Sequence, residues 1–400
     1  MINYKIPEIL RGKIALASDD IRMIDREENI ITIFPDYVSK RTNTIASGVV
    51  IESTDSIYPC AVPDLGCSFH VVELEGLFED DLKQCPHLFS QLDLLLSGKA
   101  TPLFDANKLV AFQDMILYGH DCTAHLFEEN RGHQYENGGR YEIDGSLPFS
   151  NSIFPKETER KELNEYQGHF MEILVSSDRK QSKVYLLIHS GCHLLAERFK
   201  LYYYPLFAKM SYKNHWSNKE QVISGKFRVP IDSGYEKDYF NNVNGLLNFT
   251  IAYRDIVEHA VVELIRKTVK KEFKAKLLSD YSHTKISLTE SGVIHQRGIQ
   301  YLESKRDNLY VMSGFYGVKS MLFSVETDGF YSHGSQANIE YLHDDVPDAN
   351  EMVAYEFLND AVSEVMLKQA KLAKLCYDFC LSLNGTAVDF LRPVYSFKID

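Results

Sequence analysis

The sequence lacks several features that define whole classes of protein. It contains no run approaching about 18 apolar residues, which argues against a membrane-spanning helix. Its first residues do not follow the charged-then-apolar layout of a signal peptide, so we expect a cytoplasmic protein. The seven cysteines form no Cys-x-x-Cys pair, and their odd number is typical of a reduced chain without a disulfide framework.

An excess of basic charge is also missing. Lys and Arg total 43 against 56 for Asp and Glu, which gives a formal net charge of −13. This balance excludes a general nucleic-acid coat protein, whose footprint would be basic throughout, but it allows an enzyme that holds RNA in one local groove. Glycine- and serine-rich linkers, low-complexity segments and internal repeats are absent, and 400 residues allow one large or two ordinary domains.

The chain is nevertheless rich in material for a core, since 44% of its residues are hydrophobic and 24 are Tyr and 23 Phe. Local patterns predict strands within residues 31–33, 48–51, 70–74, 170–175 and 184–188, and helices over 77–130, 236–278 and 350–383. Polar, glycine-containing sequence around 130–151 predicts a loop. Strands and helices are mixed without regular alternation, which favours an α+β fold over a doubly wound sheet.

Two short segments place metal-capable side chains beside expected strands. Asp64 and Cys67 stand three residues apart around Gly66, which lets the backbone bend so that a carboxylate and a thiolate face one centre. His169 opens an apolar strand and Glu172 follows three residues later. Taken alone, each pair is more often structural than functional.

Three further histidines stand in similar positions. His189 ends an apolar run and is followed by Ser-Gly, a context typical of a rigid strand that leads into an accessible loop. His283 follows the expected long helix, where a single histidine is more often a surface or cap residue than a ligand. His333 lies in a polar turn before Gly334.

Together and in this order, these segments resemble the motifs of the RtcB family of GTP- and manganese-dependent RNA ligases. The resemblance runs from about residue 30 to the C-terminus and rests on Phe34-Pro35-Asp36, Asp64-Leu65-Gly66-Cys67, Gly168-His169-Phe170-Met171-Glu172, His189-Ser190-Gly191, Tyr281-Ser282-His283, His295-Gln296-Arg297-Gly298, the segment from Ser313 to Ser320, Ser332-His333-Gly334, and Leu391-Arg392-Pro393 with Lys398.

The resemblance implies a centre of two Mn²⁺ ions bridged by the thiolate of Cys67. Asp64 and His169 would complete the coordination of one ion, and His189 and His283 that of the other. A thiolate with imidazoles binds Zn²⁺ more tightly than Mn²⁺ by the usual affinity order, so manganese is implied by the family alone.

The resemblance also implies GTP as a cofactor and His333 as the nucleophile that carries GMP through a phosphorus–nitrogen bond. Glu172, Ser320 and Lys398 match positions at which the family contacts the guanine nucleotide. The implied partner is RNA with a 3′-phosphate or 2′,3′-cyclic phosphate, joined to a 5′-hydroxyl end. The implied fold is a single RtcB-like domain over 1–400, with mixed sheets surrounded by helices and the active site at strand ends, and the family is mostly monomeric.

The sequence departs from the family where phosphates would be held. Gly168 replaces an asparagine, Cys192-His193 replaces Ser-Arg, and Gln336-Ala337 replaces Gly-Arg after the nucleophile. Arginine forms bidentate phosphate contacts that these residues do not reproduce. Two alternatives therefore stay open: a two-metal phosphoesterase acting on RNA ends without guanylylation, and a non-catalytic binder of RNA ends or nucleotides. The intact nucleophile favours the ligase.

Other chemistry-bearing residues receive plainer interpretations. The segment 119–125 holds two histidines, an aspartate and a cysteine, but it has no counterpart in the family and is interpreted as structural. Cys376 and Cys380 stand in an apolar helical stretch and are expected in the core. A basic run contains Arg266, Lys270 and Lys274, which would share one face of a helix and form either a solvated face or an RNA track.

Overall fold

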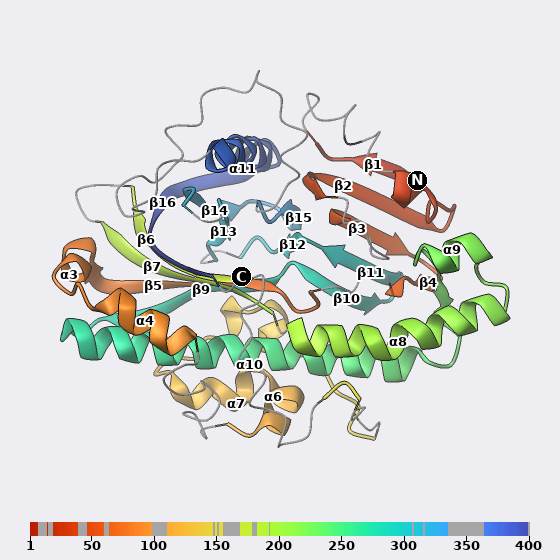
Figure 1. The fold of residues 1–400 in the computed structure, drawn as a ribbon, viewed down its shortest axis with the longest axis horizontal. Coiled ribbons are helices and arrows are strands. Elements are labelled where there is room, and N and C mark those ends of the chain that lie inside the picture. Colours follow the sequence, from red (N-terminus) through yellow and green to blue (C-terminus); the bar gives the residue numbers. More distant parts are fainter. Residues whose placement is uncertain are drawn as a thin grey trace.

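The computed structural model shows two β-sheets flanked by helices (Figure 1). The description covers residues 1–6, 14, 19–38, 46–59, 64–97, 110–146, 149, 152–154, 169–177, 182–191, 193–305, 308–314, 317–334 and 364–398.

The larger sheet is antiparallel and curved. Its seven strands, among the described residues, follow the order β13 (Tyr310–Met312), β14 (Ser320–Val325), β16 (Gly385–Lys398), β6 (Phe170–Ser176), β7 (Lys183–Ser190), β5 (Ser68–Phe78) and β9 (Lys274–Ser282). Val311 of β13 and Leu322 of β14 pack in one cluster with Val71 of β5, so one end of the sheet covers the inner face of its own central strands. The central strands are consequently buried on both faces.

The smaller sheet continues directly from the larger one. In the described part of the chain its order is β1 (Ile2–Tyr4), β2 (Asn29–Val38), β3 (Ser47–Ser53), β11 (Gly292–Arg297) and β10 (Thr284–Thr289). Two short ribbons accompany it: β12 (Ile299–Leu302) with β15 (Gly329–Ser332), and β4 (Ser56–Ile57) with β8 (Val229–Pro230). Because β9 ends at Ser282 and β10 begins at Thr284, the chain passes from one sheet to the other through His283.

The helices lie outside the sheets, some packed on strands and others on another helix. Their bounds are α2 (Asp19–Arg22), α3 (Glu79–Lys83), α4 (Leu88–Leu96), α6 (Phe112–Tyr118), α7 (His120–Thr123), α8 (His193–Lys213), α9 (Lys219–Ile223), α10 (Glu236–Val269) and α11 (Glu364–Ser382), with 3-10 turns at Ala124–Leu126, Gly132–Gln134 and Glu136–Gly139. The 34 residues of α10 extend about 51 Å. None of the helices in the described part of the chain combines the length and the apolar character that crossing a bilayer requires.

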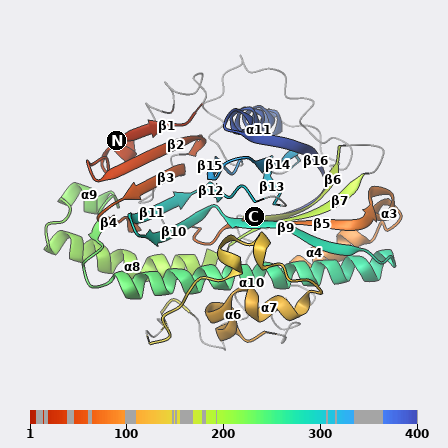
Figure 2. The ribbon, with the colours of Figure 1, turned by 180° about the vertical axis from the view of Figure 1, so that it is seen from behind.

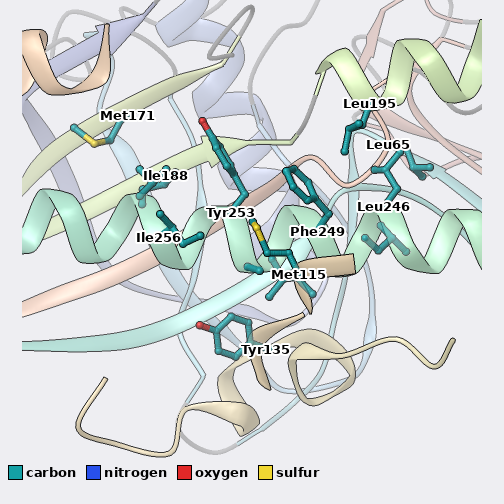
Figure 3. Close-up of a cluster of buried hydrophobic side chains, with 14 of the residues drawn as sticks. Leu65, Met115, Tyr135, Met171, Ile188, Leu195, Leu246, Phe249, Tyr253 and Ile256 are labelled. Carbon is teal, nitrogen blue, oxygen red and sulfur yellow. The ribbon is translucent and has the colours of Figure 1, made fainter. Parts of the chain in front are cut away.

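The middle of α10 lies between two layers (Figure 2). The sheets lie on one side, and α6 and α7 lie on the other. Around Phe249 and Ile256, side chains from both layers meet, including Met171 and Ile188 from the larger sheet and Met115 from α6 (Figure 3). A helix that is covered on both sides is buried around most of its circumference, which explains the weak amphipathic pattern of this segment in the sequence.

The structure confirms the α+β fold class and most of the predicted elements. The five predicted strand segments lie in β2, β3, β5, β6 and β7, and the helical prediction over 77–130 corresponds to α3, α4, α6 and α7 where the chain is described. The loop predicted around 130–151 contains, in its described part, two short 3-10 turns and an isolated bridge from Tyr135 to Asp280, with no α-helix or longer strand. Within the predicted helix 350–383, α11 begins at Glu364, and residues 350–363 lie outside the described part.

The prediction of one helix over 236–278 is wrong at its end. The helix ends at Val269, where Lys270 adopts a left-handed conformation (φ 54°) and its N–H donates to the carbonyl of Arg266. The chain then enters β9 at Lys274, which pairs with β5. This pairing joins residues some 200 positions apart, a contact that a local pattern does not contain. Consequently Arg266, Lys270 and Lys274 do not share a helical face.

Candidate active site

Three of the predicted ligands meet where the two sheets join. The Sγ atom of Cys67 lies 3.1 Å from Nε2 of His189, which lies 3.2 Å from Nε2 of His283. Cys67 precedes β5, His189 lies near the end of β7, and His283 joins β9 to β10. A main-chain hydrogen bond of 2.9 Å from His283 N–H to the Cys67 carbonyl fixes two of these positions relative to each other. We refer to these three residues as the triad.

The backbone before Cys67 is shaped to present the thiolate. Asp64 and Gly66 both have positive φ angles, 63° and 82°, and the N–H of Cys67 donates to the Asp64 carbonyl at 3.0 Å. A side chain at Gly66 would collide with Thr250 of α10, because a Cβ there would lie 2.6 Å from the Thr250 hydroxyl oxygen. Glycine is therefore required by this tight turn, as the sequence indicated.

The triad is chemically suited to hold a transition-metal ion. All three donor atoms are buried and lie within 4.8 Å of one another. Burial lowers the pKa of His189 and of His283 well below the usual value, so both imidazoles are neutral and their lone pairs are available. Tetrahedral coordination by thiolate and imidazole places neighbouring ligand atoms roughly 3.3–3.6 Å apart, close to the observed separations.

Aromatic rings hold the triad histidines in place. The ring centroid of Phe69 lies 4.7 Å from that of His189 and 5.1 Å from that of His283. Phe170 flanks His189 from the other neighbouring strand, also at 4.7 Å. Both phenylalanines pair with His189 in the strand register, so the sheet itself sets these contacts.

The other two predicted ligands lie close to the triad without joining it. The ring of His169 is buried and packs edge-on against that of His189 at 5.5 Å. The Asp64 side chain is 34% exposed, with carboxylate oxygens 3.9 Å from Nδ1 of His193 and 3.7 Å from the Arg297 guanidinium. Within the described residues, the donor atoms of the other predicted set, Asp64, Cys67 and His169, do not all lie within 4.8 Å of one another.

The predicted nucleophile lies beside the triad and has a carboxylate partner. Nδ1 of His333 lies 2.5 Å from Oδ2 of Asp36, a fully buried residue of β2, and the His333 ring lies 4.8 Å from that of His283. A carboxylate at Nδ1 fixes the ring and the tautomer, which leaves the Nε2 lone pair for attack on an electrophile. The sequence contained the Phe34-Pro35-Asp36 motif but gave no reason to pair Asp36 with a residue 297 positions away.

A glycine packs directly against the His333 ring. Gly298 has a positive φ of 66°, and a Cβ atom there would lie 3.0 Å from Cε1 of His333. The N–H of His333 also donates to the Gly298 carbonyl, at 3.4 Å. The glycine of the His295-Gln296-Arg297-Gly298 motif therefore leaves the space that the histidine ring occupies.

Arg254 of α10 binds the main chain beside two residues of the triad. It is fully buried, and it forms a two-pronged ion pair with Asp280 at 2.8 and 2.9 Å. Its remaining terminal nitrogen donates to the carbonyls of Gly66, at 3.0 Å, and Ser190, at 2.9 Å. Each carbonyl belongs to the residue next to a triad ligand. The local sequence around Arg254 does not indicate this role, because its partners come from other segments of the chain.

The ion pair continues into a buried chain of charges. His70 lies between Asp280, at 2.9 Å, and Glu258, at 2.8 Å, and Glu258 accepts two hydrogen bonds from Arg131 at 2.6 and 2.8 Å. Although burial opposes charging of His70, the two carboxylates raise its pKa to about 9. Glu258 is buried too, yet Arg131 and His70 lower its pKa to about 2. Both His70 and Glu258 are therefore charged at neutral pH.

A second group of potential ligands, His70, Asp255 and Glu258, has its donors committed to protein partners. Asp255 accepts hydrogen bonds from the hydroxyls of Thr123 and Tyr135, each at 2.5 Å, and lies 2.8 Å from Nδ1 of His120. The polar segment 119–125 therefore serves to hold Asp255, which agrees with its structural interpretation. Cys376 and Cys380 are likewise buried in the α11 core, as expected.

The predicted nucleotide contacts come from the larger sheet. Glu172 is fully buried on β6, and its Oε1 accepts a hydrogen bond from Ser396 of β16 at 2.8 Å. Burial raises its pKa to about 7. The Oγ of Ser320 accepts the Gly314 N–H at 3.1 Å. The backbone of Lys398 pairs with Phe170, next to His169, whereas its side chain lies outside the described residues.

Several cations of the basic run, which extends from Arg266 to Lys276, form ion pairs at the surface. Lys271 pairs with Asp81, Lys274 pairs with Glu129, and Arg266 donates to Glu263 at 2.9 Å. Residues 274 to 282 form one strand, so Lys274 lies about 27 Å from the site end of β9. This arrangement supports the solvated-face alternative over an RNA track that ends at His283.

Comparison with known proteins agrees with this geometry. No curated protein matches the chain. A family model described as tRNA-splicing ligase RtcB matches residues 22–299, a span that contains all five predicted metal ligands and ends before His333. The matched span covers more than half of the sequence, and it implies an RNA ligase at the level of the family. The chain therefore belongs to the RtcB family.

Proposed function

We propose that this protein joins RNA 3′-phosphate or 2′,3′-cyclic phosphate ends to 5′-hydroxyl ends through a guanylylated His333 and a two-metal centre. Family membership supports the RNA ligase class, and the arrangement of Asp36, His333 and the triad supports this particular route. The single observation that carries the proposal is the buried Asp36–His333 pair, whose imidazole lies 4.8 Å from that of His283.

In the proposed reaction, Nε2 of His333 attacks the α-phosphorus of GTP. A phosphorus–nitrogen bond forms and pyrophosphate leaves. Where the RNA end is a 2′,3′-cyclic phosphate, water first breaks the bond from phosphorus to O2′ and leaves a 3′-phosphate and a 2′-hydroxyl. An oxygen of the RNA 3′-phosphate then attacks the α-phosphorus and releases the histidine, which produces an RNA end activated with GMP. Attack of the 5′-hydroxyl on the 3′-phosphate seals the strand and releases GMP. Throughout, Asp36 holds the imidazole and stabilises its positive charge while Nε2 is bonded to phosphorus.

Metal ions bound here would polarise phosphate oxygens and offset the charge of departing groups. The triad supplies three neutral or anionic donors for one ion. Asp64 and His169 are the residues we assign to the second ion, together with the shared thiolate of Cys67. We propose Mn²⁺ for both ions on the grounds of family alone, because the donor set by itself also suits Zn²⁺.

We assign Glu172 to recognition of the guanine base. A buried carboxylate with a pKa of about 7 is readily ionised by ligand N–H donors, and its neighbour Ser396 occupies only one of its oxygens. We also propose that residues 1–400 form one catalytic domain that works as a monomer. Strand β16, close to the end of the chain, pairs with β6 and β14, so the segment beyond the family match completes the larger sheet.

The proposal is tested by mass spectrometry after incubation with Mn²⁺ and GTP. Wild type should gain the mass of one GMP in an acid-labile, alkali-stable linkage, and His333→Ala should bind metal without gaining it. Asp36→Asn should slow the modification, because the amide holds the ring without stabilising its charge. If wild type stays unmodified while it hydrolyses an RNA 3′-phosphate or cyclic phosphate, the phosphoesterase alternative is correct and the ligase proposal is wrong.

A further inference from the structure

One face of α8 carries aromatic and basic side chains towards solvent. Tyr202 and Tyr212 are 36% and 55% exposed, and Lys209 and Lys213 are exposed on the same side of the helix. With Arg198 these residues recur at spacings of three, four and seven along the helix, which places them on one continuous strip. We refer to Arg198, Tyr202, Lys209, Tyr212 and Lys213 as the α8 strip.

The charge of α8 is opposite to that of the whole protein. The helix contains four Lys or Arg residues and one acid, Glu197, whereas the chain has a net charge of −13. Glu197 accepts hydrogen bonds from Lys200, which lies off the strip, at 3.2 and 3.3 Å. The strip itself contains no carboxylate. A local positive surface on an acidic protein concentrates binding of a polyanion at one place.

The helix that carries the strip starts at the candidate active site, and the strip begins one to two turns later, at Arg198. The first residue of α8, His193, has its Nδ1 3.9 Å from the Asp64 carboxylate, and Gly191 packs against the backbone of Cys67. From there α8 runs outward over α10 (Figure 1). The distance along the helix from His193 to Tyr212 is about 28 Å, enough for several nucleotides.

We propose that the α8 strip binds the single-stranded segment of RNA that leads to the end held at the triad. Lysine and arginine side chains would contact successive phosphates, and the two tyrosine rings would stack on bases, the combination used for single strands without sequence preference. This inference rests on the proposed function, since it takes RNA as the substrate. It places the track on α8, at the opposite end of α10 from the basic run.

The test uses fluorescence anisotropy with labelled single-stranded RNA carrying a 3′-phosphate, in a short form of two nucleotides and a long form of twelve. Lys209→Ala/Lys213→Ala should reduce the slope of log K against log salt by about 1.4 for the long RNA, since each lost phosphate contact contributes roughly 0.7. Tyr202→Ala and Tyr212→Ala should each weaken binding of the long RNA roughly fivefold to a hundredfold. Tyr212→Phe should retain affinity because the ring remains.

Lys271→Ala/Lys274→Ala is the matched control, because it removes the same charge from the paired basic run. It should leave the affinity and the salt slope for RNA at wild-type values. Binding of the short RNA should be equal in all variants, since this ligand ends before the strip.

Unchanged affinity for the long RNA in both the lysine and the tyrosine variants would overturn the inference. The strip, with Leu201 64% exposed beside it, would then be a protein-docking surface. Guanylylation and the joining of short RNA ends are measured in wild type and in the same variants, so that the ligase proposal is tested separately from the α8 inference. If wild type shows neither guanylylation nor joining, the ligase proposal is wrong. If these activities are present and the strip variants bind long RNA as wild type does, only the α8 inference is wrong.

Discussion

Replacing Arg254 with methionine tests whether a buried ion pair positions the triad. The substitution removes both hydrogen bonds to Asp280 and those to the carbonyls of Gly66 and Ser190. Breaking a buried pair from one side costs about 3–5 kcal/mol. Asp280 keeps Ser68 and His70 as partners, so we expect a loss near the lower end, about 3 kcal/mol. A protein of ordinary stability remains folded after such a loss.

The loss of metal affinity should be separate from the loss of stability. Without Arg254, the residues adjoining Cys67 and His189 are released from their common anchor, and losing an outer partner of this kind typically costs 10- to 100-fold in metal affinity. We therefore expect Arg254→Met to bind Zn²⁺ or Co²⁺ 10- to 100-fold more weakly in a competition titration with a chelator. The Co²⁺ complex should also show altered thiolate-to-metal absorption.

Arg131→Met is the matched control. Arg131 is also buried and paired through two hydrogen bonds, to Glu258, but it touches neither anchored carbonyl. The Arg131→Met variant should show a similar decrease in the free energy of unfolding, and it should bind metal with wild-type affinity. In Arg254→Met/Asp280→Asn, removing the carboxylate charge that has lost its guanidinium partner should recover about 0.5–3 kcal/mol of stability without restoring metal affinity. Arg254→Met with wild-type metal affinity and reduced stability would show that the ion pair is purely structural.

Four further outcomes follow. Elemental analysis of Cys67→Ala should show loss of both ions, whereas His283→Ala should weaken mainly one; two ions retained without the thiolate contradict the bridge. The pKa of His70 is about 9, against an ordinary value of 6.5, so its protonation adds roughly 3 kcal/mol to the free energy of unfolding. This contribution is complete below pH 6.5 and is lost as the pH rises through 9. In denaturant titrations, His70→Gln should therefore show a smaller loss of stability over that pH range. The affinity for guanosine nucleotides should increase as the pH rises through about 7, because ionised Glu172 accepts hydrogen bonds from N–H groups of the base. Glu172→Gln should remove this pH dependence. If the pH dependence persists in Glu172→Gln, another group causes it. Gly298→Ala should lower the free energy of unfolding by about 1–3 kcal/mol and slow GMP transfer, with metal binding unchanged. A wild-type rate of GMP transfer would show that the His333 ring tolerates the added methyl group.

The sequence indicates individual candidate residues more readily than their arrangement. An apolar run followed by Ser-Gly indicated His189, and the spacing of Asp64 and Cys67 around Gly66 indicated Cys67, because both patterns are local. His283 was placed after a helix, whereas it joins two strands, since the pairing of β9 with β5 depends on residues far apart in the chain. Its recognition as a ligand came from the family motif and not from its local context.

The supporting residues were the hardest to predict. Arg254, His70 and Asp280 come from α10, β5 and β9, and each is an ordinary charged residue in its own segment. Their role depends on burial and mutual distance, which only the folded chain determines. The pairing of Asp36 with His333 likewise requires β2 and the end of β15 to lie side by side.

The passage of the chain through His283 has a consequence for how the protein melts. Cys67 and His189 belong to the larger sheet, whereas Asp36, which holds His333, belongs to the smaller one. A bound ion together with a phosphate shared by the triad and His333 would therefore clamp the two sheets across their common hinge. Ligands at a hundred times their dissociation constant add about 2.7 kcal/mol to the folded state. Loading should therefore raise the temperature at which both sheets unfold.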